Sequence, residues 1–498
     1  MLRAMRYAVA LTIAGSCLVL GVAGTSARMT GAQQSADTVT FTEHVAPIVF
    51  NHCARCHRPG EAAPFSLLTY EDARRRARTI ARVTGARYMP PFKAEAVDYE
   101  YEDENRLTAT QIDVLRQWSE NGAPEGDPRK LPKLPKFTEG WTLGKPDLIV
   151  TMPEAFDVPA SGPDVYRNFV IPLKLNEDKW VRAVDFRASA RSVVHHTLFF
   201  YDTTGAGKRE DEQDPGPGFG GTMGGFSISI GRQTPQSLLA EVSGRGVPTP
   251  APAAGPRGRG VAPQRPGGGV GGWAPGGQAK FSPEDIGMPL PKGSDLIVST
   301  HFHPSGKPER EQSTLGFYFA RRPPTRPSMV VMLPPMNGAF KGINIPAGEA
   351  RYTITDSFVL PVDVKAYSVG AHAHYLGKVL KLTATLPGGK TTTLLSIGDW
   401  DLAWQGRYQF KEFVTLPAGT RLDATIVFDN SADNVRNPSS PPRRVTFGEQ
   451  STNEMGQVGL AVIAAQPGGL IRLKEAYDQH LREAVLASPQ FRRGRGGS

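Results

Sequence analysis

Six of the ten histidines in this sequence fall in three close pairs, a pattern that can bind a transition metal. The pairs are His195-His196, His301-Phe302-His303 and His372-Ala373-His374. Because side chains alternate between the two faces of a strand, His372 and His374 project to the same side and can occupy two corners of one metal site. His195 and His196 are adjacent, so both reach one metal only at a bulge, a bend or a strand end. Hydrogen-bonded structural histidines explain any one pair, but three pairs favour ligation of copper, zinc, iron or nickel.

Two cysteines form a second motif with chemical potential. They lie in Cys53-Ala54-Arg55-Cys56-His57, which has the C-x-x-C-H spacing of covalent c-type haem attachment. The two thiols would bond the porphyrin, and the histidine would become an axial ligand of the iron. A redox dithiol is the alternative, but it belongs with a βαβ pattern that the surrounding sequence lacks. Met89, which precedes two prolines on a stiff loop, is the candidate for the second axial ligand, with core packing as its alternative role.

Short helices are expected around the cysteine motif. Residues 42–52 are predicted to form a helix that leads into it, and residues 70–83 a second, arginine-rich helix. Thr108 and Gln111 have the spacing of a capping box at the start of a third helix. Residues 38–127 are therefore expected to form a small all-α domain of the class I cytochrome c type.

From about residue 145 onward, short apolar alternations lie between turn residues, which is typical of all-β sandwiches and barrels. Strands are expected at residues 148–150, 168–172, 180–186, 193–201, 295–303, 352–359, 365–374, 380–386, 391–397, 409–416 and 422–428. Residues 244–277 are rich in Gly, Pro and Arg and are expected to form a long surface loop without a packed element. A helix is expected near the C-terminus, with His480 at its surface.

The N-terminus has the composition of a secretory signal, residues 1–27. Arg3 and Arg6 precede an apolar run, and Thr25-Ser26-Ala27 fits a cleavage site. The protein is therefore expected to be exported, periplasmic or secreted, with anchoring through an uncleaved N-terminal segment as the alternative. The net charge of +9 is modest for 498 residues and forms no basic helix with interleaved aromatics, so nucleic-acid binding is not expected.

The region from about residue 145 to 465 resembles the copper type II ascorbate-dependent monooxygenases, the family of peptidylglycine α-hydroxylating monooxygenase and dopamine β-monooxygenase. The motifs that carry the resemblance are, in order, Val194-His195-His196, Ser299-Thr300-His301-Phe302, Ala371–Lys378, Leu416–Thr420, Phe428–Ser431, Asn437-Pro438 and Ser451–Met455. No single motif is decisive, but the ordered set is specific. The resemblance implies a mainly β fold with two tandem antiparallel β-sandwich, jelly-roll-like domains preceded by the all-α cytochrome c domain. The expected divisions are a linker at 128–144, the two β domains at 145–314 and 315–465, and a helical, basic tail at 466–498.

The resemblance also implies two copper ions. The ligands of the first centre, which passes electrons, are His195, His196 and His301. The ligands of the second, catalytic centre, which activates O2 for hydrogen abstraction from a substrate C–H bond, are His372, His374 and Met455. A soft thioether ligand favours Cu(I), the form that reacts with oxygen. His303 has no counterpart role, and is either a neighbour of the first copper or a ligand in place of His301.

Four positions depart from the family. Disulfides staple the peptide- and catecholamine-acting members, and Gly456 stands where they have a cysteine after the ligating methionine. Gly370 replaces the arginine that grips a peptide carboxylate in the peptide-acting member, and Gln457 and Gly459 replace its Asn and Tyr. A glycine-extended peptide is therefore not the expected substrate.

The sequence thus predicts an exported haem–copper monooxygenase that hydroxylates a C–H bond of an unknown small organic substrate with O2. Electrons are expected to pass from the c-type haem to the first copper and then to the second, with ascorbate or a redox protein as the external donor. One alternative is a haem–copper electron-transfer or copper-binding protein without hydroxylase activity. Another is a zinc or structural metal site, which the thioether and the fused cytochrome disfavour.

Overall fold

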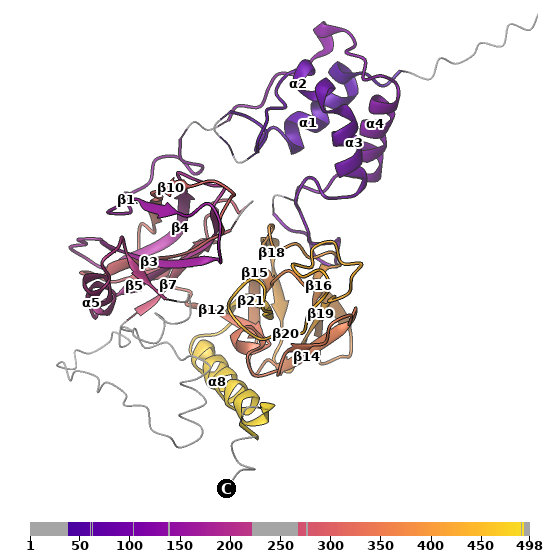
Figure 1. The fold of residues 1–498 in the computed structure, drawn as a ribbon. Coiled ribbons are helices and arrows are strands. Elements are labelled where there is room, and N and C mark those ends of the chain that lie inside the picture. Colours follow the sequence, from indigo (N-terminus) through magenta and orange to yellow (C-terminus); the bar gives the residue numbers. More distant parts are fainter. Residues whose placement is uncertain are drawn as a thin grey trace, which may run out of the picture.

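The computed structural model of the chain describes a mainly β protein with helices near both ends (Figure 1). The described residues are 38–59, 61, 63–102, 104–137, 140–221, 267–274, 277–489, 491 and 492. The expected signal segment, residues 1–27, lies outside them. Within the described ranges, no helix combines the length and the apolar character needed to cross a membrane.

The N-terminal part folds as a helical unit with its own apolar core. Its helices are η1 (Phe41–Val45), α1 (Ala46–His52), α2 (Tyr70–Arg75), α3 (Ala77–Gly85), α4 (Ala109–Glu120) and the 3-10 turn η2 (Pro128–Lys130). Fully buried Phe41, Val49, Leu115 and Trp118 lie at the centre of that core. The ring of Phe41 contacts that of Trp118 at a centroid distance of 5.9 Å, which joins the first helical turn to α4.

Two of the expected helices are confirmed and one is interrupted. The Thr108 side chain accepts from the N–H of Gln111 and the Gln111 side chain accepts from the N–H of Thr108, so the capping box forms. The expected helix 70–83 was wrong as a single element, because Arg76 leaves helical geometry between α2 and α3. The Arg76 guanidinium instead lies over the ring of Phe65, 4.5 Å from its centroid.

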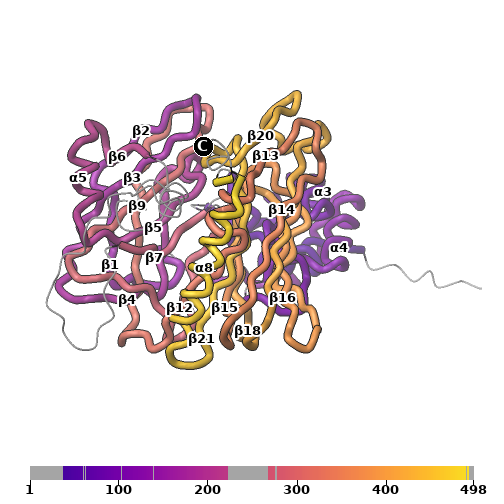
Figure 2. The backbone as a smooth tube through the Cα atoms, turned by 90° about the horizontal axis from the view of Figure 1, so that it is seen from below, coloured from indigo at the N-terminus to yellow at the C-terminus, as the bar shows by residue number. Residues whose placement is uncertain are grey.

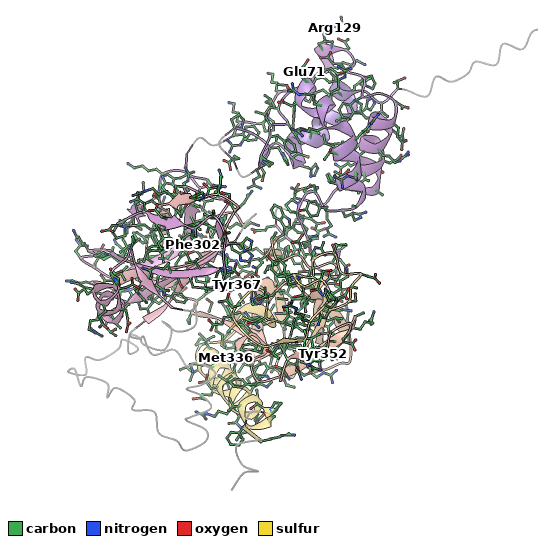
Figure 3. All side chains as sticks on the ribbon, in the orientation of Figure 1. Glu71, Arg129, Phe302, Met336, Tyr352 and Tyr367 are labelled. Atoms are coloured by element: carbon green, nitrogen blue, oxygen red, sulfur yellow. The ribbon has the colours of Figure 1, made fainter. Side chains whose placement is uncertain are left out.

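The first β unit has two antiparallel sheets that share one apolar core. Its elements are β1 (Leu148–Thr151), β2 (Phe156–Val158), β3 (Val165–Pro172), β4 (Lys179–Arg187), β5 (Val194–Asp202), α5 (Ala206–Gln213), β6 (Phe219–Gly220), β7 (Gly267–Trp273), β8 (Met288–Leu290), β9 (Asp295–Phe302), β10 (Glu309–Glu311) and β11 (Thr314–Phe319). The strand orders are β1-β11-β4-β8 and β6-β3-β9-β5-β7. Phe302, labelled in Figure 3, is fully buried in the shared core.

Two expectations for this unit need correction. The low-complexity stretch 244–277 was expected to lack packed structure, yet β7 pairs with β5 along its length. Its glycines permit this pairing, because a Cβ at Gly268 would lie 2.8 Å from the Tyr201 ring. The expected boundary at 314/315 is also misplaced. Since β11 pairs with β1 and β4, the first β unit extends to Phe319.

The second β unit repeats the arrangement with two further sheets around one core. Its elements are β12 (Ser328–Leu333), η3 (Pro335–Gly338), β13 (Asn344–Ile345), β14 (Tyr352–Val359), β15 (Val364–Ala373), β16 (Gly377–Thr385), β17 (Thr391–Ile397), β18 (Arg407–Leu416), β19 (Arg421–Phe428), β20 (Val445–Thr446) and β21 (Gly456–Ala464). The main strand orders are β12-β21-β15-β18 and β14-β19-β16-β17. In both Figure 1 and Figure 2 the two β units lie side by side.

The C-terminal helix α8 (Gly469–Ala487) packs on the second β unit, as Figure 2 shows. Buried Leu473 and Tyr477 join the core of that unit, and the Tyr477 hydroxyl donates to the carbonyl of Met332 at 2.9 Å. His480 was expected at the surface, which was wrong. Its side chain is only 15% exposed, and its Nε2 lies 2.8 Å from Asp356 Oδ2, because the helix turns this face onto β14.

An arm formed by residues 92–101 leaves the helical unit between α3 and α4 and packs into the second β unit. Ala94 and Tyr101 are buried in the core of that unit, although both fall within the range 38–127 expected for one helical domain. The arm therefore ties the first unit in the sequence directly to the last.

Candidate metal centres

The first histidine cluster lies where β5 and β9 pair. His196 is directly opposite His301 in the antiparallel register, and the register shifts between Val194 and His196. This bulge leaves His195 as the extra residue, so the side chains of His195 and His196 can turn toward the same point. A break in the alternation of this kind is needed if two adjacent strand residues are to bind one metal. Their Nδ1 atoms are 2.9 Å apart, close to the spacing of about 3 Å for two donors that share one metal at about 2 Å.

His301 completes this cluster. Its ring centroid lies 4.7 Å from that of His195 and 4.9 Å from that of His196, and candidate ligand atoms of all three lie within 4.8 Å of one another. His301 is 2% exposed, and neither of its ring nitrogens makes a hydrogen bond. Burying a ring nitrogen without a hydrogen-bond partner is costly, and a bound metal ion would remove that cost. The residues present therefore fit a metal ion.

Asp164 stands on the far side of His301. Its Oδ2 lies 2.9 Å from His301 Nε2, at ion-pair distance but without the alignment of a hydrogen bond. It also contacts His303 Nδ1 at 2.7 Å and accepts from the Ser451 hydroxyl at 2.5 Å. Burial raises the pKa of Asp164, but the contacts with His301, Ser451 and His303 outweigh it and hold that pKa well below its usual range. The carboxylate therefore stays ionised and faces Nε2 of His301, while Nδ1 of His301 has no hydrogen-bond partner.

His303 lies outside the cluster. Its side chain is 54% exposed and contacts Asp164, so the structure brings His301 and not His303 together with the adjacent pair. Tyr166 covers the other side of His301, with ring centroids 4.3 Å apart and planes inclined by 17°. Its hydroxyl donates to the carbonyl of Glu449 at 2.9 Å, which links this cluster to the second β unit.

The second pair lies at the end of β15. The rings of His372 and His374 have centroids 5.1 Å apart and are nearly perpendicular, at 87°. Nδ1 of His372 lies 2.6 Å from Oε1 of Gln405, and Nδ1 of His374 lies 3.1 Å from the carbonyl of Asn453. Each oxygen is an acceptor, so each Nδ1 carries the proton and each Nε2 keeps its lone pair for a metal.

Met455 lies beside this pair through strand pairing. It directly precedes β21, in which Gly456 is opposite Ala373 and Gln457 is opposite His372. Met455 is 8% exposed, so its thioether is largely shielded from water. The structure thus brings all three residues expected in the second centre to one end of the β15–β21 pair.

Glu454 holds the backbone of this centre in place through hydrogen bonds. The sequence analysis did not identify it as a functional residue. Its Oε2 accepts from the N–H groups of His374 at 3.0 Å and Met455 at 3.2 Å, and its Oε1 accepts from the N–H of Leu376 at 2.6 Å. Burial raises the pKa of Glu454 to about 8, and the three hydrogen bonds oppose that rise. One buried carboxylate therefore fixes the backbone of two expected ligands. Only its place inside the motif Ser451–Met455 signalled it.

Electrostatic interactions connect the two histidine clusters, which belong to different β units. Burial lowers the pKa of His196, and the charges of His301, His195, His372 and His374 lower it further. The hydrogen bond from Ser451 to Asp164 joins the loop that carries Met455 to the first cluster. Sequence spacing indicated neither contact, since Asp164 and Ser451 are 287 residues apart.

The buried histidines predict a pH dependence of the metal-free protein. Burial, aided by neighbouring histidine charge, lowers the pKa of both His195 and His374 to about 3. The unfolded chain binds protons at these positions below about pH 6.5, and the folded chain does not until about pH 3. The free energy of unfolding is therefore expected to be fully present above about pH 6.5, and to fall by up to about 1.4 kcal/mol per pH unit per histidine below it.

Denaturant unfolding of the metal-free protein at pH 7.5 and at pH 5 measures this effect. The variant His374→Asn should lose less stability between the two pH values than the wild type. Equal stability of the wild-type protein at both pH values would contradict the neutral, buried state of these rings.

The cysteine motif lies at the end of α1 in the helical unit. Cys53 and Cys56 are not bonded to each other, and burial raises the pKa of the Cys53 thiol to about 12. His57 Nδ1 lies 3.1 Å from the carbonyl of Phe65, so Nδ1 carries the proton and Nε2 remains for a metal. These residues fit covalent haem attachment. Met89 is half-buried in the loop that follows α3.

The cysteine motif also approaches the first β unit. Arg191, four residues before His195, lies 3.8 Å from the carboxylate of Glu61, and its charge lowers the pKa of Cys56 against the larger effect of burial. Arg58 lies over the ring of Phe137 at 4.7 Å. The segment that carries His195 therefore begins next to the motif.

Comparison with models of protein families found no match, and neither did comparison with curated proteins. Similar solved structures include PNGF-II, at 9% identity over 62% of this chain and 66% of that chain, with a TM-score of 0.24. Another is the major capsid protein P2 from bacteriophage PM2, at 8% identity over 64% of this chain and 98% of that chain, with a TM-score of 0.22. Likenesses this weak carry no argument about the fold or the function of the chain.

Proposed function

We infer that this protein is an exported, haem- and copper-containing monooxygenase that hydroxylates a C–H bond of a small organic substrate with O2. In this proposal the two β units are tandem β-sandwich domains of jelly-roll-like form. The helical unit is a cytochrome c domain that takes electrons from ascorbate or a redox protein. The substrate is of unknown class.

The observation that carries the proposal is the three-histidine cluster at the β5 bulge. Its member His301 is buried, and neither ring nitrogen makes a hydrogen bond. Asp164 faces Nε2 of His301, but Nδ1 has no hydrogen-bond partner and the three imidazoles converge within 4.8 Å of one another, so the cluster is best explained as a ligand set. The three imidazoles suit a copper ion that changes oxidation state.

The second centre would have a thioether donor in addition to its two imidazoles, whereas the first would have three imidazoles. This difference supports electron transfer at the first centre and oxygen activation at the second. Copper, when bound, supplies one-electron redox chemistry and the activation of O2. Gln405 and Asn453 hold the protons on Nδ1 of His372 and His374, which aims both Nε2 atoms away from these acceptors. The soft thioether of Met455 favours Cu(I), while Glu454 keeps Met455 and His374 in register.

The helical unit supports delivery of electrons within the chain. Cys53, Cys56 and His57 would attach and ligate a haem, and the contact between Glu61 and Arg191 brings their helix close to the segment that leads into the first cluster. Tethering gives such a donor a high effective concentration. Met89 would be the second axial ligand, which raises the haem potential.

Replacing Met89 with alanine is expected to slow the reduction of copper by the haem without removing copper. The reason is that a haem iron without its second protein ligand would change its coordination with its oxidation state, which slows electron transfer although the lower potential favours it, while the histidine clusters stay intact. Stopped-flow absorbance of the haem and copper analysis of the same sample measure the two effects separately. An unchanged rate of copper reduction would remove Met89 from this route.

Oxygen uptake tests the proposed function. The protein is produced with haem attached, loaded with copper and supplied with ascorbate and a set of small organic compounds as C–H donors, and oxygen consumption is followed with an electrode. We expect uptake that requires copper and that zinc does not support. Copper that is reduced and reoxidised without catalytic oxygen uptake would instead identify an electron-transfer protein.

A further inference from the structure

We propose that the arm of residues 92–101 helps to position the ligands of the second metal centre. In this proposal Lys93 acts on His372 and His374 through the loop 399–405. This inference rests on the proposed function, because it assumes that these histidines bind copper. It adds to the centre a set of positioning residues that come from the helical unit.

The arm covers open sheet edges of the second β unit. The strands β18 and β17 are the edges of their sheets. The N–H of Glu102, just past the arm, donates to the carbonyl of Gln409 on β18 at 2.8 Å, and the N–H of Glu95 donates to the carbonyl of Ser396 on β17 at 2.8 Å. Edge strands expose unpaired backbone groups, so this cover completes both sheets.

Aromatic packing fixes the arm in place. Tyr101 is fully buried, and its hydroxyl donates to the carbonyl of Leu394 at 2.7 Å. Its ring stacks on Phe410 with centroids 5.5 Å apart, and Phe92 meets Tyr408 edge-on at 5.1 Å. A buried, hydrogen-bonded tyrosine makes this a permanent contact between the units.

Lys93 reaches from the arm into the loop that follows β17. Its side chain is only 6% exposed, and its Nζ lies 3.5 Å from Asp399 Oδ2 and 3.9 Å from Asp401 Oδ2. Arg436 holds the same Asp399 through two contacts of 2.8 and 2.9 Å. Arg436 and Lys378 also contact these carboxylates, so removal of Lys93 reduces their charge compensation without abolishing it, and the loop loses its ionic tie to the arm.

The loop then contacts both histidines of the second centre. Oδ1 of Asp401 accepts from the N–H of Ala403 at 3.0 Å, which shapes the turn that leads to Gln405. Gln405 in turn holds Nδ1 of His372 at 2.6 Å. The indole N–H of Trp400, which is 1% exposed, donates to the carbonyl of His374 at 3.2 Å.

A set of contacts therefore runs from Lys93 through the loop to the imidazole of His372 and to the backbone carbonyl of His374. Outer partners of metal-bound histidines tune metal affinity by about 10- to 100-fold when they touch the ligand directly. Asp401 acts one contact further out than Gln405 and Lys93 acts two contacts further out, so removal of either is expected to weaken copper binding at the second centre by about three- to tenfold. Among the contacts of the described residues, those of this loop do not include the first cluster, which should therefore keep its affinity.

Competition of the full-length protein with a coloured Cu(I) chelator tests the inference. We expect Lys93→Ala and Asp401→Asn to weaken one of two bound copper ions, and Lys93→Arg to restore it. The control is Lys411→Ala, which removes only an exposed contact of the same arm, the pair of Lys411 with Glu100 at 2.7 Å. The electron paramagnetic resonance spectrum of Cu(II) should change for one copper in Lys93→Ala and for neither in the control.

Two results would overturn the inference alone. The first is wild-type affinity for both copper ions in Lys93→Ala and Asp401→Asn, and the second is equal weakening of both ions, which marks a general loss of structure. If Lys93→Ala does not fold, Asp401→Asn decides the question because it leaves the arm lysine in place. Failure of the wild-type protein to bind a second copper would instead defeat the proposed function, and this inference with it.

Discussion

Replacing Met455 with alanine is expected to lower copper-dependent oxygen uptake by more than about 100-fold, because a ligand contributes more than the outer partners whose loss costs 10- to 100-fold. Met455 is buried and directly precedes β21, beside the end of β15 that carries His372. The oxygen electrode measures the loss, and copper analysis of the same sample should still find the copper of the first cluster.

Met332→Ala provides the matched control. Met332 lies on β12 opposite Gly459 of β21, in the same sheet as the second centre but four residues further along the strand than Met455. Its replacement should alter stability and leave the oxygen uptake per bound copper unchanged. Equal uptake in Met455→Ala and the wild-type protein would remove the thioether from the catalytic centre.

Replacing His301 with alanine is expected to empty the first cluster and to leave the second occupied. His301 is the most buried member of the cluster and the only one contributed by β9, so its loss leaves two donors from one strand. The copper content should fall from two ions to one per chain. Rapid-mixing experiments should then show a reduced haem that no longer transfers its electron to copper.

The neighbouring variant His303→Ala separates ligation from local structure. His303 contacts the same Asp164 but is half exposed and lies outside the cluster. This variant should retain two copper ions per chain. If His303→Ala loses copper and His301→Ala does not, the two histidines have exchanged the roles assigned to them.

Local patterns in the sequence predicted much of the fold. The strand of residues 391–397 was expected at the bounds that β17 has, and the capping box at Thr108 formed as expected. The adjacency of His195 and His196 allowed a bulge, a bend or a strand end if both bind one metal, and the structure has a bulge there. These features depend on neighbours within a few residues.

Features set by distant contacts could not be predicted in this way. Composition marked residues 267–273 as a loop, but the small size of glycine lets this strand lie close under Tyr201. Asp164 and Glu454 were missed because each acts on residues far away in the sequence. The arm was missed for the same reason, since the partner of Tyr101 is Leu394, 293 residues further along the chain.

The choice between His301 and His303 shows the same limit within one motif. Both histidines occupy the end of a single strand-like stretch, and their spacing alone allows either to face the adjacent pair. The strand register decides which histidine lies beside the adjacent pair. His301 is opposite His196, whereas His303 lies just beyond the end of β9 and contacts Asp164.

The ratio of copper to haem in the purified, copper-loaded protein tests the central claim most directly. It is measured by elemental analysis together with the absorbance of the covalently attached haem. The account predicts two copper ions per haem in the wild-type protein, one in His301→Ala and one in His372→Ala. One copper or none in the wild-type protein, or an unchanged ratio in both variants, would contradict it.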